Sequence, residues 1–180
     1  MASKNTINTV DGDTLIINAL AKQLRYDKTK TKTMLELAKH GVIAVETFVE
    51  LAISKVGKLE RSNVDGQDFV DGSDAKKGTV HTHSHGKKTH LTRECVISNL
   101  KNKNGALRVV IADPFVKDVF YFKIPHEEIK GRKQINFIFN FFGGKPEKFN
   151  NPSFSSNEDT TLSWRLWNEY RVNTFKELCQ

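Results

Sequence analysis

Four aspartates lie within ten residues of one another in a chain that is otherwise basic. They are Asp65, Asp68, Asp71 and Asp74, and Lys76 follows after a single residue. Carboxylates this close repel one another, and repel any bound phosphate, unless a cation neutralises them. Hydrolysis of a phosphodiester needs carboxylates that hold Mg²⁺, a metal ion that lowers the pKa of water, and a basic group near the nucleophile. Asp68, Asp74 and Lys76 could supply these parts.

A strand is needed to present these side chains together. If residues 72–80 form one, Asp74 and Lys76 stand two positions apart and point to the same face. A turn ahead of the strand could bring Asp68 against that face. The alternative is that the aspartates, Asp71 above all, only make turns, because Asp and Gly are ordinary turn formers.

A long helix is expected ahead of this cluster, from about Met34 to Val56. Thr33 and Glu36 would form its capping box. Glu50 lies on the same helix, outside its apolar stripe. That stripe is made of residues that recur at steps of three and four, namely Ala38, Val42, Val45, Val49, Ala52 and Val56.

Strands dominate the rest of the chain. Residues 106–114 and 119–125 are rich in β-branched and aromatic side chains and flank a short Asp-Pro connection, so they predict a hairpin. Residues 135–142 predict a further strand. Thr174 and Glu177 predict a capped helix at the end of the chain.

Together these elements predict a single α/β (α+β) domain over residues 1–180, with a central mixed β-sheet flanked by helices. Its core is expected at about 34–142. The C-terminal part, 145–180, is expected to be a loop and a helix that serve dimerisation or contact with DNA. An apolar stripe for core or dimer packing would be formed there by Trp164, Trp167 and Tyr170.

The order of the acidic residues and the lysine resembles the PD-(D/E)xK nuclease superfamily. Its motif is an acidic residue, a variable gap, and then an acidic residue, any residue and lysine, which corresponds here to Asp68 and to Asp74-Ala75-Lys76. The stretch 47–125, with a His-rich segment and a hairpin after the motif, is similar to small PvuII-like type II restriction endonucleases. Two features depart from the pattern, since no proline precedes Asp68 and the gap to Asp74 is short.

The resemblance implies a restriction-endonuclease-like fold and a Mg²⁺-dependent DNA endonuclease. Lys76 would orient the attacking water at the scissile phosphate. The implied metal ligands are Asp68, Asp74 and the backbone carbonyl of Ala75. Asp65 could take the place of Asp68 as the first ligand, and Glu50 is a candidate for an additional acidic residue.

Histidines and lysines follow the motif at once. In PvuII-like enzymes a histidine-containing segment after the catalytic strand reads bases, so the resemblance implies that double-stranded DNA is contacted by Thr82, His83, Ser84, His85, Lys87 and Lys88. The histidines could instead hold zinc, because alternate positions of an extended segment share one side; these are His81, His83, His85 and His90. Neither a cysteine nor an acidic residue completes a recognised zinc pattern with them, which argues against this alternative.

The charge of the whole chain points to a polyanionic partner. Its 180 residues carry 28 Lys and Arg against 21 Asp and Glu, a formal net charge of +7, as expected for a protein that attracts nucleic acid and displaces counterions. A homodimer is expected if the DNA site is palindromic. Further basic residues are expected as solvated surface charges, namely Arg93, Lys101, Lys103, Arg108, Lys130, Arg132 and Lys133.

The remaining features concern the cellular compartment. Cys95 and Cys179 make neither a disulfide framework nor a CxxC pair, which favours a reducing compartment. The first residues lack the apolar core of a signal peptide, and the most apolar later run, residues 137–142, is too short to span a bilayer. A cytoplasmic protein without membrane contact is therefore expected. The alternatives that stay open are a non-enzymatic nucleic-acid-binding protein and a His-centred zinc enzyme.

Overall fold

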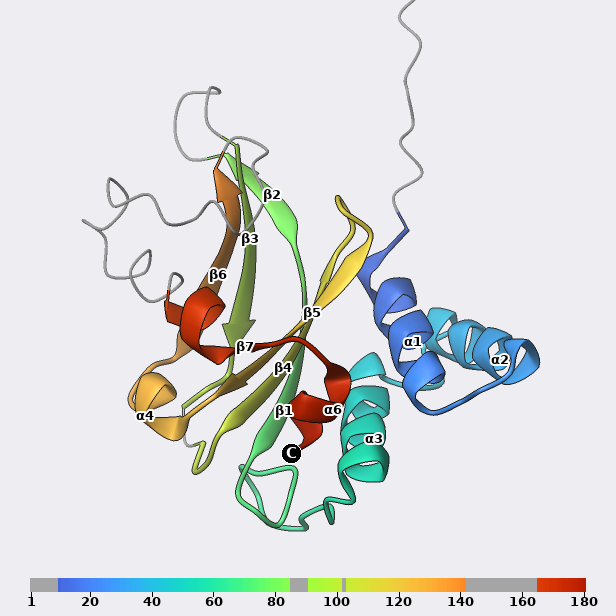
Figure 1. Ribbon diagram of the computed structural model, residues 1–180, viewed down its shortest axis with the longest axis horizontal. Coiled ribbons are helices and arrows are strands. Elements are labelled where there is room, and N and C mark those ends of the chain that lie inside the picture. Colours follow the sequence, from blue (N-terminus) through green and yellow to red (C-terminus); the bar gives the residue numbers. More distant parts are fainter. Residues whose placement is uncertain (1–9, 85–90, 102, 142–164) are drawn as a thin grey trace, which may run out of the picture.

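The computed structural model describes residues 10–84, 91–101, 103–141 and 165–180. Within these ranges it is one α+β fold, in which helices cover one face of a mixed sheet and a second sheet lies on the other side (Figure 1). The elements in chain order are α1 (Gly12–Gln23), α2 (Lys28–Lys39), α3 (Val45–Gly57), β1 (Asp74–Thr79), β2 (His81–Ser84), β3 (Leu91–Ser98), β4 (Leu107–Asp113), β5 (Asp118–Ile124), α4 (His126–Ile129), β6 (Gln134–Phe141), the π-helical turn η3 (Leu166–Tyr170), β7 (Arg171–Val172) and α6 (Phe175–Cys179).

The first described element, α1, is a helix that the sequence patterns did not predict. Asp11 caps α1, because its carboxylate accepts a hydrogen bond from the Thr14 N–H at 2.9 Å. The helix buries Ile16, Ile17 and Leu20, and it packs against α3 and β4.

The single helix predicted from Met34 to Val56 is wrong. α2 ends at Lys39 and α3 begins at Val45. Gly41 takes a left-handed backbone conformation (φ 68°), which favours glycine and ends the first helix. Val42, predicted to lie in the buried stripe, is 66% exposed.

The capping box predicted at Thr33 is also wrong, because the helix that contains Thr33 begins five residues earlier. Thr33 lies inside α2, and the N-cap is Asp27, whose carboxylate accepts from the Lys30 N–H at 2.8 Å. α2 itself buries none of its residues. α3 packs its apolar face into the core with Val45, Phe48, Val49, Ala52 and Ile53.

The strand predictions are confirmed more closely. The first sheet has the order β1-β4-β5-β7, in which β1 and β4 run parallel and the other pairs are antiparallel. β1 lies within the predicted range 72–80, and β4 and β5 form the predicted hairpin. The second sheet, β2-β3-β6, is antiparallel and contains the strand predicted at 135–142. The predicted α+β class with a mixed sheet and helices is therefore confirmed.

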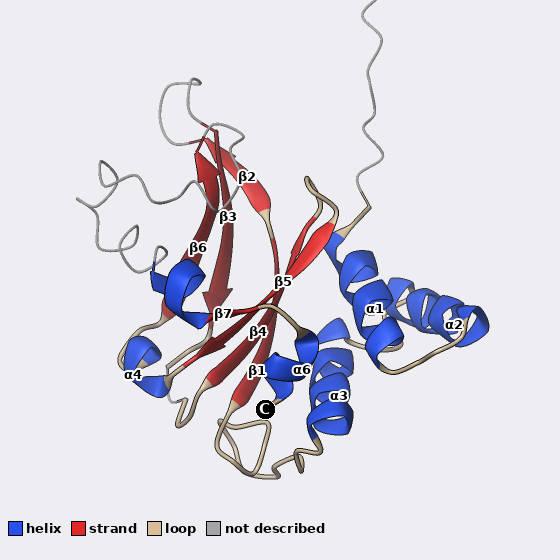
Figure 2. Cartoon of the chain, in the orientation of Figure 1, coloured by secondary structure: helices blue, strands red, loops and turns tan. Residues whose placement is uncertain are grey.

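Apolar side chains form two clusters, one on each face of the first sheet. One cluster joins this sheet to α1, α3 and α6, and the other fills the space between the two sheets. Figure 2 shows how these helices and the two sheets are arranged. Trp167 belongs to the second cluster and makes edge contacts with Phe120, Phe122 and Phe139 at centroid distances of 5.3, 5.1 and 4.9 Å. Its role in the described part of the chain is core packing, and Trp164 lies outside the described residues.

The C-terminal helix is tied into the first cluster. The predicted capping box is confirmed, since Thr174 and Glu177 each accept a hydrogen bond from the other's backbone. Phe175, Leu178 and Cys179 are buried. Core residues therefore come from α1 and α6 as well as from the range 34–142. Both cysteines are buried and free.

The helices of the described ranges are short or polar. None of them is both long and apolar enough to cross a membrane.

Candidate active site

Asp74 and Lys76 stand on the same face of β1, as strand alternation requires. Gly78 continues this face, where a Cβ would collide with Cys95 and Ile97 of β3, so the face is turned towards the second sheet. Asp74 is 1% exposed. Its Oδ2 lies 3.3 Å from the Lys76 Nζ.

Asp68 lies along the edge of β1 that pairs with no other described strand, called the free edge below. The Asp74 N–H donates to the Ala106 carbonyl ahead of β4, so the N–H of the next residue, Ala75, points away from the sheet. That N–H donates to Asp68 Oδ2 at 2.7 Å. The N–H and C=O of one strand residue point to the same side, and the Ala75 carbonyl is therefore directed to the side on which Asp68 lies.

Lys103 joins the site from the loop between β3 and β4. Its Nζ lies 2.7 Å from Asp74 Oδ1, and its side chain is 14% exposed. The prediction that it is a solvated surface charge is wrong. The signal that could have found it is the parallel pairing of β1 with β4, which sets Asp74 beside Leu107 and brings the preceding loop to the start of β1.

Two glycines let this loop pack against the turn ahead of β1. A Cβ on Gly105 would collide with the backbone of Gly72 and Ser73. Gly72 itself has a left-handed backbone, with φ 83°. The two backbones are therefore in direct contact, and this contact positions Lys103 over Asp74.

The surroundings of Asp68 disfavour its negative charge. The pKa of Asp68 is raised to about 6, first by burial and then by the negative charges of Asp74 and Glu50, against the lowering effect of the Ala75 N–H. Glu50 comes from α3 and is held by Arg61, with its Oε2 at 2.5 Å from the guanidinium. Carboxylates from α3 and from β1 thus both raise the pKa of Asp68 in the segment 58–73.

One oxygen of this cluster lacks a hydrogen bond. Asp74 Oδ2 is buried and accepts none among the described residues, although the Lys76 Nζ stands 3.3 Å away. A buried anionic oxygen without a full set of partners is costly. Next to a second carboxylate and a backbone carbonyl, such an oxygen suits a hard divalent cation, so Asp68, Asp74 and Ala75 fit Mg²⁺.

The protein side chains at this site are few for a metal centre. No group of three or more His, Cys, Asp or Glu side chains in the described part of the chain could hold a metal ion. Mg²⁺ commonly binds through one or two carboxylates and keeps water and substrate phosphate as its other ligands. The pair Asp68 and Asp74 meets that requirement.

A buried arginine holds the turn that precedes β1. The Arg108 guanidinium donates to Asp71 Oδ2 at 3.0 Å, to Ser73 Oγ at 3.1 Å and to the Leu178 carbonyl. Burial raises the pKa of Asp71, but hydrogen bonds from Ser73 and Arg108 outweigh it and hold this pKa below its ordinary value. Asp71 therefore serves the turn. Arg108 was predicted to be a solvated charge, which is wrong, because it is 2% exposed.

The structure thus brings together five of the residues predicted for the site, Ala75 among them, and separates one. Asp68, Asp74 and Lys76 meet at the start of β1, with Glu50 close enough to affect the pKa of Asp68. Asp65 is exposed in the turn before Gly66 and has no side-chain partner among the described residues.

β2 carries the start of the segment predicted to contact DNA. His81 and Thr82 are exposed, and the backbones of His83 and Ser84 pair with β3. The contribution of this segment to DNA or zinc binding stays a prediction. The other residues named for these roles lie outside the described residues, namely His85, Lys87, Lys88 and His90.

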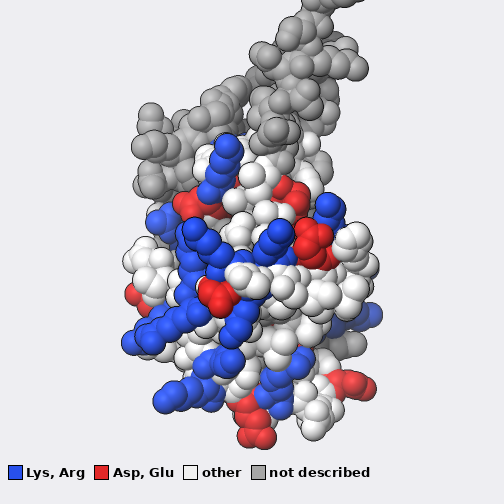
Figure 3. All heavy atoms as spheres, turned by 90° about the vertical axis from the view of Figure 1, so that its right-hand side faces the viewer, with Lys and Arg blue, Asp and Glu red and all other residues white. Residues whose placement is uncertain are grey.

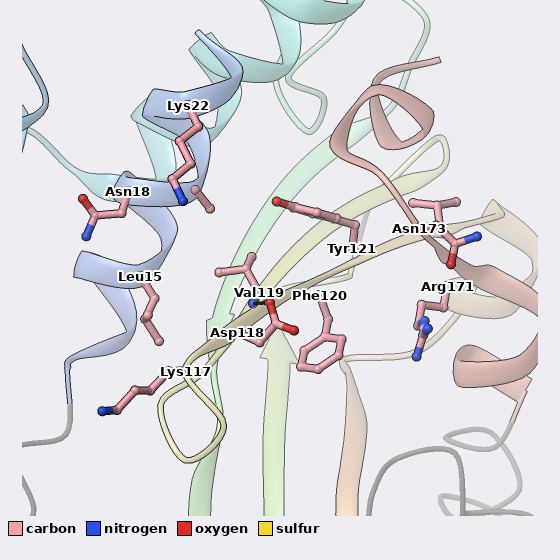
Figure 4. A pocket seen from close by; sticks show the side chains of 12 residues that line it. Leu15, Asn18, Lys22, Lys117, Asp118, Val119, Phe120, Tyr121, Arg171 and Asn173 are labelled. Atoms are coloured by element: carbon pink, nitrogen blue, oxygen red, sulfur yellow. Dashed lines mark hydrogen bonds between the residues drawn. The ribbon is translucent and has the colours of Figure 1, made fainter. Parts of the chain in front are cut away.

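Cationic side chains also gather away from the acidic site. Lys and Arg side chains spread over the face made by α1 and α2 (Figure 3). A hollow of about 410 Å³ lies between α1, the β4–β5 turn and β7, and Lys22, Lys117 and Arg171 are among its lining residues (Figure 4). Positive surfaces of this kind attract polyanions.

Taken as chemistry, the acidic site offers two carboxylates, a backbone carbonyl and two ammonium groups at one sheet edge. These are groups that can hold a cation, a water molecule and a phosphate together. Comparisons with protein-family models, with curated proteins and with solved structures found no match. Function is therefore inferred from the geometry of this site.

Proposed function

We propose that this protein is a Mg²⁺-dependent, site-specific endonuclease that hydrolyses phosphodiester bonds of double-stranded DNA, in the manner of a type II restriction enzyme. The observation that supports this most directly is the meeting of Asp68, Asp74 and Lys76 at the free edge of β1. There a buried carboxylate oxygen accepts no hydrogen bond from the part of the chain that the structure describes. The net charge of +7 suits a polyanionic substrate.

Each residue has a role that its place allows. Asp68, Asp74 and the Ala75 carbonyl would hold Mg²⁺. When bound, the ion lowers the pKa of water and offsets the charge that develops on the phosphate. Lys76 would hydrogen-bond the attacking water and orient it towards the phosphorus. Glu50, fixed by Arg61, keeps a negative charge beside Asp68 that favours a cation over an empty pair of carboxylates.

The proposed partners follow from the substrate. The exposed side chains of β2 and the residues after it would contact base edges, because a β-ribbon can enter the major groove. A homodimer would match a palindromic DNA site, since a two-fold protein presents two equivalent active sites to two strands.

Cleavage of a large phage DNA, with Mg²⁺ or with EDTA, tests the proposal on a gel. Discrete bands that require Mg²⁺ are expected. Lys76→Met and Asp74→Asn should abolish the bands while the DNA is still retarded. Lys101→Met removes an exposed charge from the loop that carries Lys103 and is the matched control, which should cleave like the wild type.

Two other outcomes would change the conclusion. A smear would indicate a nuclease without sequence preference. Intact but retarded DNA would favour a non-enzymatic nucleic-acid-binding protein, in which the contacts of Asp74 with Lys76 and Lys103 are purely structural.

A further inference from the structure

Lys103 contacts one oxygen of the Asp74 carboxylate whose other oxygen would bind the cation. Its Nζ lies 2.7 Å from Asp74 Oδ1, while the Lys76 Nζ approaches Oδ2 at 3.3 Å. The Asp74 side chain is 2% exposed, and the two lysine side chains are 14% and 19% exposed. Two ammonium groups therefore bracket one buried carboxylate.

The charges of the site are balanced by these contacts. Glu50 is paired with Arg61, and Asp74 lies between Lys76 and Lys103. A divalent cation bound to Asp74 would stand within a few ångströms of both ammonium groups, and like charges at that distance repel strongly away from bulk water. One ammonium group must leave Asp74 for the ion to bind well.

The two lysines differ in how freely they can leave. Lys76 belongs to β1, which is paired with β4 along its length. Lys103 belongs to the loop between β3 and β4, four residues before that strand begins at Leu107. A phosphate beside the site would draw its ammonium group away from Asp74, since lysine binds phosphate as a point charge.

We propose that Lys103 is a tethered competitor for the divalent cation, and that phosphate of the nucleic acid relieves this competition by taking the ammonium group from Asp74. The inference rests on the proposed function and adds a form of regulation to the same site. DNA and the ion then bind with positive cooperativity, because each favours the state in which Lys103 has left Asp74. The protein loads its metal chiefly when its substrate is present.

Affinity for Mn²⁺, measured from the electron paramagnetic resonance signal of the free ion, tests this directly. Lys103→Met keeps the length of the side chain without its charge, and Lys101→Met is the matched control in the same loop. Without DNA, Lys103→Met should bind Mn²⁺ at least about tenfold more tightly than the wild type. A short DNA duplex should strengthen binding to the wild type and to Lys101→Met about fivefold or more, and strengthen binding to Lys103→Met much less.

Three further variants and measurements keep the test decisive. Lys103→Arg retains the charge and should bind Mn²⁺ as weakly as the wild type. Asp74→Asn, added to Lys103→Met, should abolish the binding and so locate the ion. Thermal unfolding should show a larger rise in Tm with Mn²⁺ for Lys103→Met than for the wild type.

The results separate this inference from the proposed function. Equal Mn²⁺ affinities of Lys103→Met and the wild type would refute the proposal that Lys103 competes with the cation, and so would an equal effect of DNA on both. The proposed function would still hold if the wild type cleaves DNA in a Mg²⁺-dependent way. If Lys103→Met does not fold, a wild-type affinity for Mn²⁺ that DNA leaves unchanged overturns the proposal on Lys103 equally. Failure of every variant to bind Mn²⁺, with and without DNA, would overturn both proposals.

Discussion

The negative charge of Asp68 should destabilise the fold at neutral pH, so Asp68→Asn is expected to stabilise it. The pKa of this carboxyl is about 6, against an ordinary value of 3.8. Because the pKa is higher in the folded protein than in the unfolded chain, the folded state binds the proton more tightly. The protonated Asp68 carboxyl therefore stabilises the folded state. This stabilisation is full below about pH 3.8 and is lost as the pH rises through about 6.

The size of the effect follows from the same values. A difference of about two pKa units corresponds to ~3 kcal/mol in the free energy of unfolding. Asp68 is half-buried, so solvent screens part of the repulsion and a gain of about 1 kcal/mol is expected. The asparagine amide keeps an oxygen that can accept the Ala75 N–H, so the substitution removes the charge and leaves the edge contact in place.

Urea denaturation in EDTA, at about pH 7.5 and at about pH 4, measures this effect. Asp68→Asn should exceed the wild type at the higher pH, and the difference should shrink towards zero at the lower pH. Asp65→Asn is the control, because Asp65 is exposed in the same turn region, and its stability should stay within about 0.5 kcal/mol of the wild type. A variant Asp68→Asn that is less stable than the wild type at neutral pH would refute the reasoning.

Three other substitutions test the packing around the site. Arg108→Met should lower the free energy of unfolding by about 2–3 kcal/mol, because it leaves Asp71 and the Leu178 carbonyl without their buried donor; a loss below about 1 kcal/mol in urea denaturation would show that these bonds add little. Gly105→Ala should cost about 1–3 kcal/mol, because its Cβ would collide with the Gly72 backbone; an unchanged Tm would mean that the two loops can separate freely. Trp167→Ala should lower the free energy of unfolding by about 3–5 kcal/mol, because it leaves a cavity among three phenylalanines. Guanidinium denaturation measures this loss, and an unchanged free energy of unfolding would contradict the place of Trp167 in the core.

Local patterns predicted the part of the site that one strand carries. The alternation of β1 sets Asp74 and Lys76 on one face, and this follows from a period of two that needs no tertiary contact. The hairpin of β4 and β5 was equally accessible, because its residues are β-branched and aromatic on both sides of a short turn. Such features depend on neighbours in sequence.

Features that depend on distant partners were missed. Lys103 and Arg108 look like surface charges in sequence, and their burial follows from the pairing of β1 with β4 and from the docking of α6. The break between α2 and α3 was missed because apolar spacing continues across Gly41, while the backbone there turns left-handed. α1 was missed although Asp11 is a good N-cap, because its apolar residues are buried only through packing against α3 and β4, which lie far away in sequence.

The free edge of β1 has a consequence for the behaviour of the protein in concentrated solution. An unpaired strand edge is a template on which another chain can add a strand, and proteins protect such edges with charges and with side chains that occupy the backbone donors. Asp68 does both here, because it carries a charge and accepts the outward Ala75 N–H. Asp68→Ala would uncover that donor, and light scattering should then reveal self-association that Asp68→Asn does not cause. Asp68, which is proposed to bind metal, thus also reduces the tendency of the protein to aggregate. Selection on this residue would act through solubility as well as through chemistry.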